Sequence, residues 1–161
     1  MKQSRYYYIE FGIDRSVAPF TPEMKKKLLD LLFNEFDGIF TPERYNSFEP
    51  VNKTFTDQEE LSQLWDDECF FLKKISQPKM NFSFYKYNAT LLDHSIYRFI
   101  FDVGKKVDPG TVELFLKRMI EITHPCFCFA TSDTHWYARC IVKYVHVQGT
   151  KEHHINLNDK R

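Results

Sequence analysis

The chain has 161 residues with 22 basic and 22 acidic side chains, so its formal net charge is zero. This length predicts one domain over 1–161 with a core over about 6–147, and the neutral charge provides no field that would attract nucleic acid or an anionic membrane. Its five glycines form no G-x-G, which excludes a dinucleotide fingerprint and a Gly-rich phosphate loop.

The first residues, Met1 to Arg5, are positively charged but have no apolar run and no small-residue cleavage site. The longest apolar stretches fall well short of the roughly 20 residues that a membrane-spanning helix needs. We therefore expect a cytoplasmic protein that makes no membrane contact. Four cysteines, at 69, 126, 128 and 140, are expected to be reduced thiols in that compartment.

The N-terminal third predicts a strand, a helix and a short helical turn. Residues 6–13 alternate in hydrophobicity with a period of two, which is typical of a strand. Thr21-Pro22-Glu23 has the residues of a helix start, and apolar residues at helical spacing continue to a predicted end near Gly38. Thr41-Pro42-Glu43 repeats this start signal and predicts a short helical turn before the loop 46–52.

The remaining two thirds predict a short helix, a meander of strands and a second long helix. Thr56 and Glu59 have the spacing of a capping box at the start of the short helix. Strands are expected over 70–75, 80–87 and 96–103, followed by a helix that begins at Asp108-Pro109. A last β region is expected over 126–147, and the tail 150–161 is expected to be loosely held.

This order of elements predicts an α+β single domain. We expect an antiparallel or mixed sheet of about five to six strands, with helices packed mainly on one face. Sixteen Phe, nine Tyr and two Trp predict an aromatic core. The tyrosines at 6, 8, 85 and 87 are expected on the second, amphipathic face of the sheet.

Several residues of metal-binding or nucleophilic type follow residue 123. His124, Cys126 and Cys128 would share one face of a strand, but an extended C-x-C holds its sulfurs too far apart for easy chelation, so we expect no metal and no cofactor. A small hydrolase or acyl-transfer enzyme stays open as an alternative function. Its centre would be a Cys/His pair, with Cys126, Cys128 or Cys140 near His124, His135 or His146, or a Ser132/Asp133/His135 centre.

Charge is unevenly distributed within the neutral total. No Lys or Arg occurs between Thr54 and Leu72, whereas this stretch contains six acids: Asp57, Glu59, Glu60, Asp66, Asp67 and Glu68. The first three favour a helix N-terminus through the helix dipole, but the last three lie at the other end, where the dipole disfavours them. The segment is either a solvated face or a docking surface for a basic partner.

Trp65 stands beside these acids and has two interpretations. It is either the aromatic centre of an interface or a core residue, and its helical spacing from Leu61 favours the core. The aromatic strands do not predict direct nucleic-acid binding, because the chain has no basic and aromatic RNP-like run.

The layout resembles that of the small cytoplasmic immunity proteins of bacterial polymorphic-toxin and contact-dependent or type VI secretion systems. The resemblance rests on the aromatic strand from Tyr6 to Phe11, the long capped helix after it, the Thr41 to Tyr45 segment, the acidic helix from Leu61 to Trp65 and the Phe-rich run from Phe82 to Tyr85. It implies a non-catalytic protein that binds a cognate protein toxin and occludes its active site. Acids of such inhibitors often replace nucleic-acid phosphate when the toxin is a nuclease, and the matching segment here is 57–68.

Overall fold

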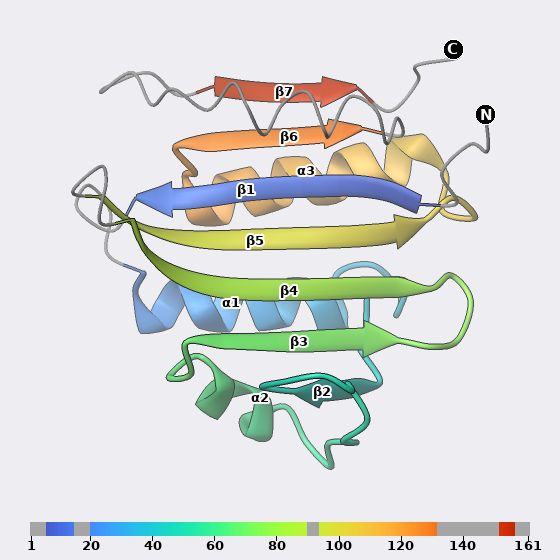
Figure 1. Cartoon of the computed structure of the whole chain (residues 1–161). Helices are drawn as coiled ribbons and strands as arrows, with labels where there is room; N and C mark the ends of the chain where they lie inside the picture. Colours follow the sequence, from blue (N-terminus) through green and yellow to red (C-terminus); the bar gives the residue numbers. More distant parts are fainter. Residues whose placement is uncertain (1–5, 15–19, 90–93, 132–151, 157–161) are drawn as a thin grey trace.

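The computed structural model describes residues 6–14, 20–89, 94–131 and 152–156, which form seven strands and three helices (Figure 1). The predicted α+β class is confirmed. The elements in chain order are β1 (Tyr6–Asp14), α1 (Pro22–Asn34), β2 (Arg44–Asn46), α2 (Glu59–Leu64), β3 (Cys69–Lys74), β4 (Met80–Ala89), β5 (His94–Gly104), α3 (Pro109–Thr123), β6 (Phe127–Thr131) and β7 (Glu152–Asn156).

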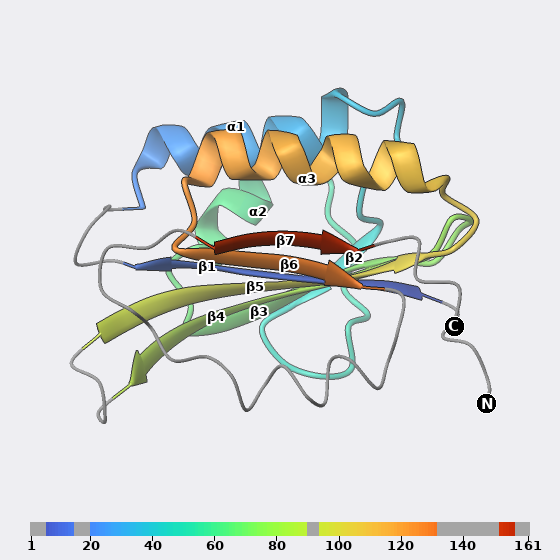
Figure 2. The ribbon, with the colours of Figure 1, turned by 90° about the horizontal axis from the view of Figure 1, so that it is seen from above.

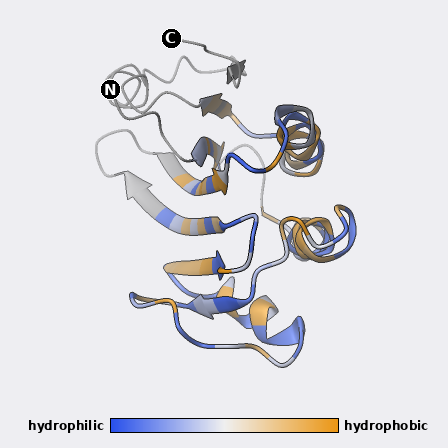
Figure 3. Ribbon diagram, turned by 90° about the vertical axis from the view of Figure 1, so that its right-hand side faces the viewer, coloured by the Kyte–Doolittle hydropathy of each residue, from blue (hydrophilic) through white to orange (hydrophobic). Residues whose placement is uncertain are grey.

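The strands form one mixed sheet in the order β2-β3-β4-β5-β1-β6-β7. Neighbouring strands are antiparallel except β6 and β7, which are parallel. Helices α1 and α3 lie side by side on one face of this sheet, as Figure 2 shows from above and Figure 3 shows along the strands. The expectation that helices pack mainly on one face is therefore confirmed.

Both long helices begin at the predicted caps. The Thr21 hydroxyl accepts a hydrogen bond from the Met24 amide (3.2 Å), and the Asp108 carboxylate accepts bonds from the amides of Gly110 (2.9 Å) and Thr111 (3.2 Å). Such caps satisfy amides that have no partner within the helix. Helix α1 ends at Asn34 rather than near Gly38, although Gly38 does take the left-handed conformation with a φ of 77°.

Aromatic rings fill the space between the sheet and helices α1 and α3. Alternate residues of β1, β4 and β5 point to this face, and Phe11 stacks on Phe99 with 4.5 Å between ring centroids. From the helix layer, Phe115 stacks on Phe40 at 4.0 Å and meets the Phe101 ring edge-on at 5.3 Å. Apolar area removed from water in this layer is the main favourable term in the stability of the fold.

Two predictions for short segments are wrong. Residues 41–43 do not begin a helical turn: the Glu43 amide donates to Lys73 O (2.8 Å), and β2 continues this pairing along β3. Strand pairing along the edge of β3 thus overrides the local helix-start signal. Residues 152–156 of the expected loose tail form β7 beside β6, so the sheet has seven strands rather than five or six.

The last predicted β region is only partly described. Its first part is β6, which starts at Phe127 and pairs with β1. The remainder, 132–147, lies outside the described residues. Within the part of the chain that is described, no helix has both the length and the apolar character needed to cross a membrane.

Candidate partner-binding surface

The first three acids of the predicted surface lie at the start of α2. The Asp57 carboxylate accepts hydrogen bonds from the amides of Glu59 (2.9 Å) and Glu60 (3.2 Å). The Thr56 hydroxyl donates to Glu60 Oε1 (2.8 Å). The predicted capping box does not form: the N-cap is Gln58, whose side chain makes no capping bond. Asp57, one residue earlier, accepts from the first amides, and Glu60, not Glu59, reaches back to Thr56. Asp57 and Glu59 are exposed, and Glu60 is half-buried.

The other three acids form the turn that leaves α2. Asp66 and Glu68 are exposed, and Asp67 is half-buried where its carboxylate accepts a hydrogen bond from the Ser47 hydroxyl. Lys86 holds the turn against β4, because its amide donates to Glu68 O (2.8 Å) and its ammonium to Asp66 O (2.9 Å). These bonds use main-chain oxygens, so both exposed carboxylates remain available to a partner.

Trp65 does not belong to this surface. Its side chain is buried, and its indole meets the rings of Phe20 (5.1 Å), Phe70 (5.0 Å) and Phe84 (5.1 Å) edge-on. The interpretation of Trp65 as a core residue is confirmed, and its assignment to a partner-binding surface is wrong. A single amphipathic turn of helix explains this, since Leu61, Leu64 and Trp65 all face the core.

The sequence analysis missed the aromatic residue that does stand among the acids. Phe48 is 62% exposed, the most exposed large apolar side chain of the described residues. It follows Ser47, whose hydroxyl donates to the Asp67 carboxylate, so the loop that carries Phe48 is hydrogen-bonded to the acidic turn. No periodic pattern marks a residue in an irregular loop, and only its position between two turn-forming segments could have suggested its exposure.

A buried asparagine fixes the loop that carries Phe48. The Asn46 side-chain amide donates to Pro50 O (3.0 Å) and to Asn52 Oδ1 (3.5 Å), and its carbonyl accepts from the Ser47 amide (2.9 Å). Asn46 is 2% exposed, so these bonds are shielded from water. Phe48 is therefore presented by a loop with its own internal hydrogen bonds. We call Phe48, Asp66, Asp67 and Glu68 the acidic rim.

The acidic rim has a phenol and two cations near it, and one of these cations is Lys86, whose ammonium donates to Asp66 O. Tyr45 donates its hydroxyl to Glu60 Oε2 (3.4 Å), and partial burial followed by the negative charge of Glu60 raises the pKa of this phenol. The Lys53 ammonium lies 5.9 Å from the centroid of the Phe48 ring, a weak cation–π contact at an exposed site.

The thiols of Cys126 and Cys128 do not have the environment of a nucleophile. Burial raises the pKa of Cys126, and it raises the pKa of Cys128 to about 12, whereas an activated cysteine has a lowered pKa. His124 is exposed in the left-handed cap of α3, outside the strand. The single-face arrangement predicted for His124, Cys126 and Cys128 is wrong for that reason, and the described residues contain no group of three side chains able to hold a metal.

The other candidate residues of an enzyme centre cannot be placed. Ser132, Asp133, His135, Cys140 and His146 lie outside the described residues.

A polar cluster on the sheet face away from the helices was also missed. Glu10 is 3% exposed, and its carboxylate accepts hydrogen bonds from Arg98 Nε and from the Tyr8 hydroxyl (2.7 Å). Asp102, the cross-strand partner of Tyr8, has a pKa raised by burial. Placing these residues together required the register of β1 against β5, which hydrophobic periodicity does not determine.

No protein-family model matches the sequence, and no curated protein matches it.

Proposed function

We propose that the chain is a non-catalytic binding protein that neutralises a cognate protein toxin by docking a basic surface of the toxin on the acidic rim. The observation that carries this proposal is the exposed Phe48, on a loop that is hydrogen-bonded through Ser47 to the turn with three consecutive acids. Aromatic residues, Phe included, are enriched in protein interfaces, and the rim of an interface is polar.

The two parts of the rim have different roles in this proposal. The carboxylates of Asp66 and Glu68 steer a basic partner toward the surface and raise the association rate. The Phe48 ring enters an apolar pocket of the partner and slows dissociation. The bonds of Asn46 reduce the entropy lost on binding, because the loop is ordered before the partner arrives.

The layout of the sequence supports a toxin as the partner class. The resemblance to immunity proteins implies inhibition by occlusion, and a nuclease toxin would offer a cleft that is basic because it binds phosphate. The acids of the rim would then occupy positions that nucleic-acid phosphates take in the uninhibited toxin. No observation among the described residues favours a Cys/His enzyme, and that alternative is not proposed.

The experiment measures binding to the protein encoded immediately upstream of this gene, which the proposal expects to be the toxin. The triple variant D66N/D67N/E68Q is compared with E23Q/E113Q/E121Q, which removes the same charge from the exposed sides of α1 and α3. We expect the rim variant to associate more slowly and to lose most of its salt dependence between about 50 and 500 mM salt. We expect the control variant to bind like the wild type.

Phe48→Ala tests the anchor separately. It is expected to accelerate dissociation by about 30-fold, equivalent to about 2 kcal/mol, with little change in the association rate. A rim variant whose affinity equals that of the wild type at every salt concentration would remove the docking role of the acids. An upstream protein that is no toxin, or a toxin whose activity persists in the complex, would overturn the proposed function itself.

A further inference from the structure

Ser47 precedes the exposed Phe48, and each of its polar groups forms a hydrogen bond. Its amide donates to Asn46 Oδ1 (2.9 Å), its hydroxyl donates to the Asp67 carboxylate, and its carbonyl accepts from the Cys69 thiol (3.5 Å). Asp67 and Cys69 lie 20 and 22 residues further along the sequence, after α2. The backbone next to Phe48 is therefore fixed from the acidic turn as well as from its own loop.

The three acids of the rim differ in what their carboxylates contact. Asp66 and Glu68 are exposed, and within the described part of the chain their carboxylates accept no hydrogen bond. Asp67 is half-buried, and its carboxylate accepts from the Ser47 hydroxyl. The Asp67 carboxylate is thus bonded to the neighbouring loop, whereas the two exposed carboxylates can meet a partner.

The turn that carries Asp67 is fixed on both sides of this residue. Before it, Trp65 is buried in the core, and the Asp67 amide donates to Leu64 O (3.0 Å). After it, the Glu68 carbonyl accepts from the Lys86 amide (2.8 Å). A carboxylate on this turn can hold a loop that itself lies outside the helices and strands.

We infer that Asp67 is a positioning residue, which acts through Ser47 to hold the Phe48 loop in its binding conformation. This inference rests on the proposed docking of a toxin at the acidic rim. A hydrogen bond to a charged acceptor is stronger than one between neutral groups, and an anchor that is ordered before binding loses less conformational entropy in the complex. Asp67 therefore slows dissociation through Phe48, whereas Asp66 and Glu68 mainly speed association.

The test compares Asp67→Asn with Asp67→Ala in binding to the protein encoded immediately upstream. Both substitutions remove one charge, but only asparagine keeps an oxygen that can accept from the Ser47 hydroxyl. We expect both variants to associate more slowly by the same factor and only Asp67→Ala to dissociate faster, by about three- to tenfold. Ser47→Ala should dissociate like Asp67→Ala. Equal dissociation rates of the two Asp67 variants would overturn the inference, because charge would then be all that Asp67 contributes.

A double-mutant cycle shows whether Asp67 acts through the anchor. In a Phe48→Ala background, Asp67→Ala is expected to cause no further acceleration of dissociation, because the residue that it positions is already absent. Strictly additive effects on the logarithm of the dissociation rate would contradict the inference. Unfolding midpoints of all variants verify that each is folded.

Amide hydrogen exchange in the unbound chain tests the positioning without a partner. The Ser47 amide is bonded to Asn46 Oδ1 within the loop, so its exchange reports how often the loop opens. We expect faster exchange in Asp67→Ala but not in Asp67→Asn or in Asp66→Ala, which removes the same charge from the same turn. Unchanged exchange in Asp67→Ala would overturn the inference. If the upstream protein does not bind even the wild type, the proposed function fails, and this comparison still decides whether Asp67 holds the loop.

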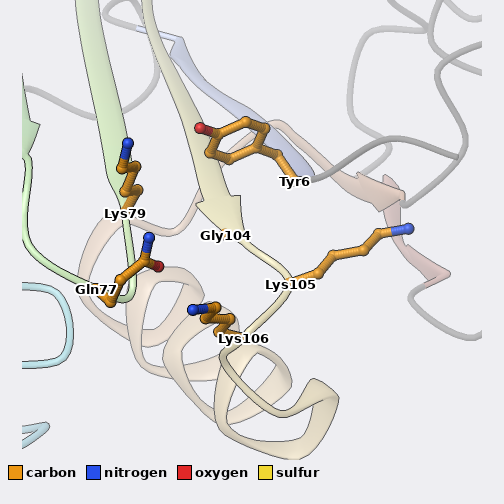
Figure 4. A pocket seen from close by; sticks show the side chains of 6 residues that line it. All are labelled: Tyr6, Gln77, Lys79, Gly104, Lys105 and Lys106. Atoms are coloured by element: carbon orange, nitrogen blue, oxygen red, sulfur yellow. The ribbon is translucent and has the colours of Figure 1, made fainter. Parts of the chain in front are cut away.

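The opposite end of β4 provides a distant control. An open depression of about 430 Å³ lies there, lined by Tyr6, Gln77, Lys79, Gly104, Lys105 and Lys106 (Figure 4). Lys79 directly precedes β4, whereas Lys86, near the other end of this strand, is bonded to the acidic turn. K79Q/K106Q therefore changes the total charge far from the loop and is expected to leave the dissociation rate and the Ser47 exchange unchanged. Acceleration in this control as well would mean that both rates respond to charge in general, which would overturn the role of the hydrogen bond.

Discussion

The two faces of the central sheet are buried by different interactions. On the face that α1 and α3 cover, rings such as Phe84 and Phe99 are fully buried among other rings. On the opposite face Glu10 is almost as completely buried, but its charge is matched by Arg98 and the Tyr8 hydroxyl. Apolar burial requires only complementary shape, whereas a buried carboxylate requires particular partners.

This difference predicts how each face responds to substitution. Loss of a ring leaves a cavity whose cost depends on its volume. Loss of one member of the polar cluster leaves an uncompensated group, whose cost depends on whether its partner is also removed. The predictions below begin with the largest effect.

Phe99→Ala is expected to lower the free energy of unfolding by about 3–5 kcal/mol, because the ring fills the layer between Phe11 (4.5 Å) and Phe84 (5.1 Å). Urea unfolding followed by circular dichroism measures the change. The control is Ile100→Ala, whose side chain is half-buried on the opposite face and whose loss should cost about 1 kcal/mol. Equal losses in the two variants would contradict the described difference between the faces.

Glu10→Gln is expected to destabilise the fold by about 1–3 kcal/mol, since Arg98 Nε then loses its charged acceptor. Arg98→Met should cost a similar amount. The double variant should recover part of the loss, because neither charge is then left alone. A double-mutant cycle from urea unfolding measures this coupling, and strictly additive losses would show that the two side chains act independently.

The covered face is the part of the fold that the sequence predicts well. The period of two in 6–13 and the helical spacing after Thr21 and Asp108 each report which side chains are apolar, and the covered face is defined by that property alone. Short elements are predicted less well. Strand β2 has three residues and depends on the edge of β3, while β7 depends on pairing with β6, and neither partner can be inferred from the local sequence.

The candidate surface also has a part that the local sequence predicts and a part that depends on contacts between distant segments. The six acids from Asp57 to Glu68 lie within one short segment of the sequence, so the sequence alone points to them. Trp65 lies in the same segment but is buried and does not belong to the surface. Phe48 joins the acids only through the bond between Ser47 and Asp67. Contacts between residues this distant in sequence have no signature in a single chain.

The smallest expected change in the free energy of unfolding comes from a substitution of Asp102, which lies on the same polar face of the sheet as Glu10. Burial raises the pKa of its carboxyl above the unfolded value, so the folded state binds the proton more tightly than the unfolded state does. The contribution of Asp102 to stability is therefore greatest below the unfolded pKa and falls as the pH rises through the folded pKa.

Asp102→Asn removes this titration and is expected to raise stability at pH 7 by less than about 1 kcal/mol, because the amide carries no charge that burial penalises. The variant is compared with the wild type by urea unfolding from about pH 4 to pH 8. The gain should shrink toward the acidic end, where the wild-type carboxyl is protonated and resembles the amide. A gain of constant size at every pH would mean that the substitution acts through packing against Tyr8 and Asn81, its cross-strand partners, rather than through charge.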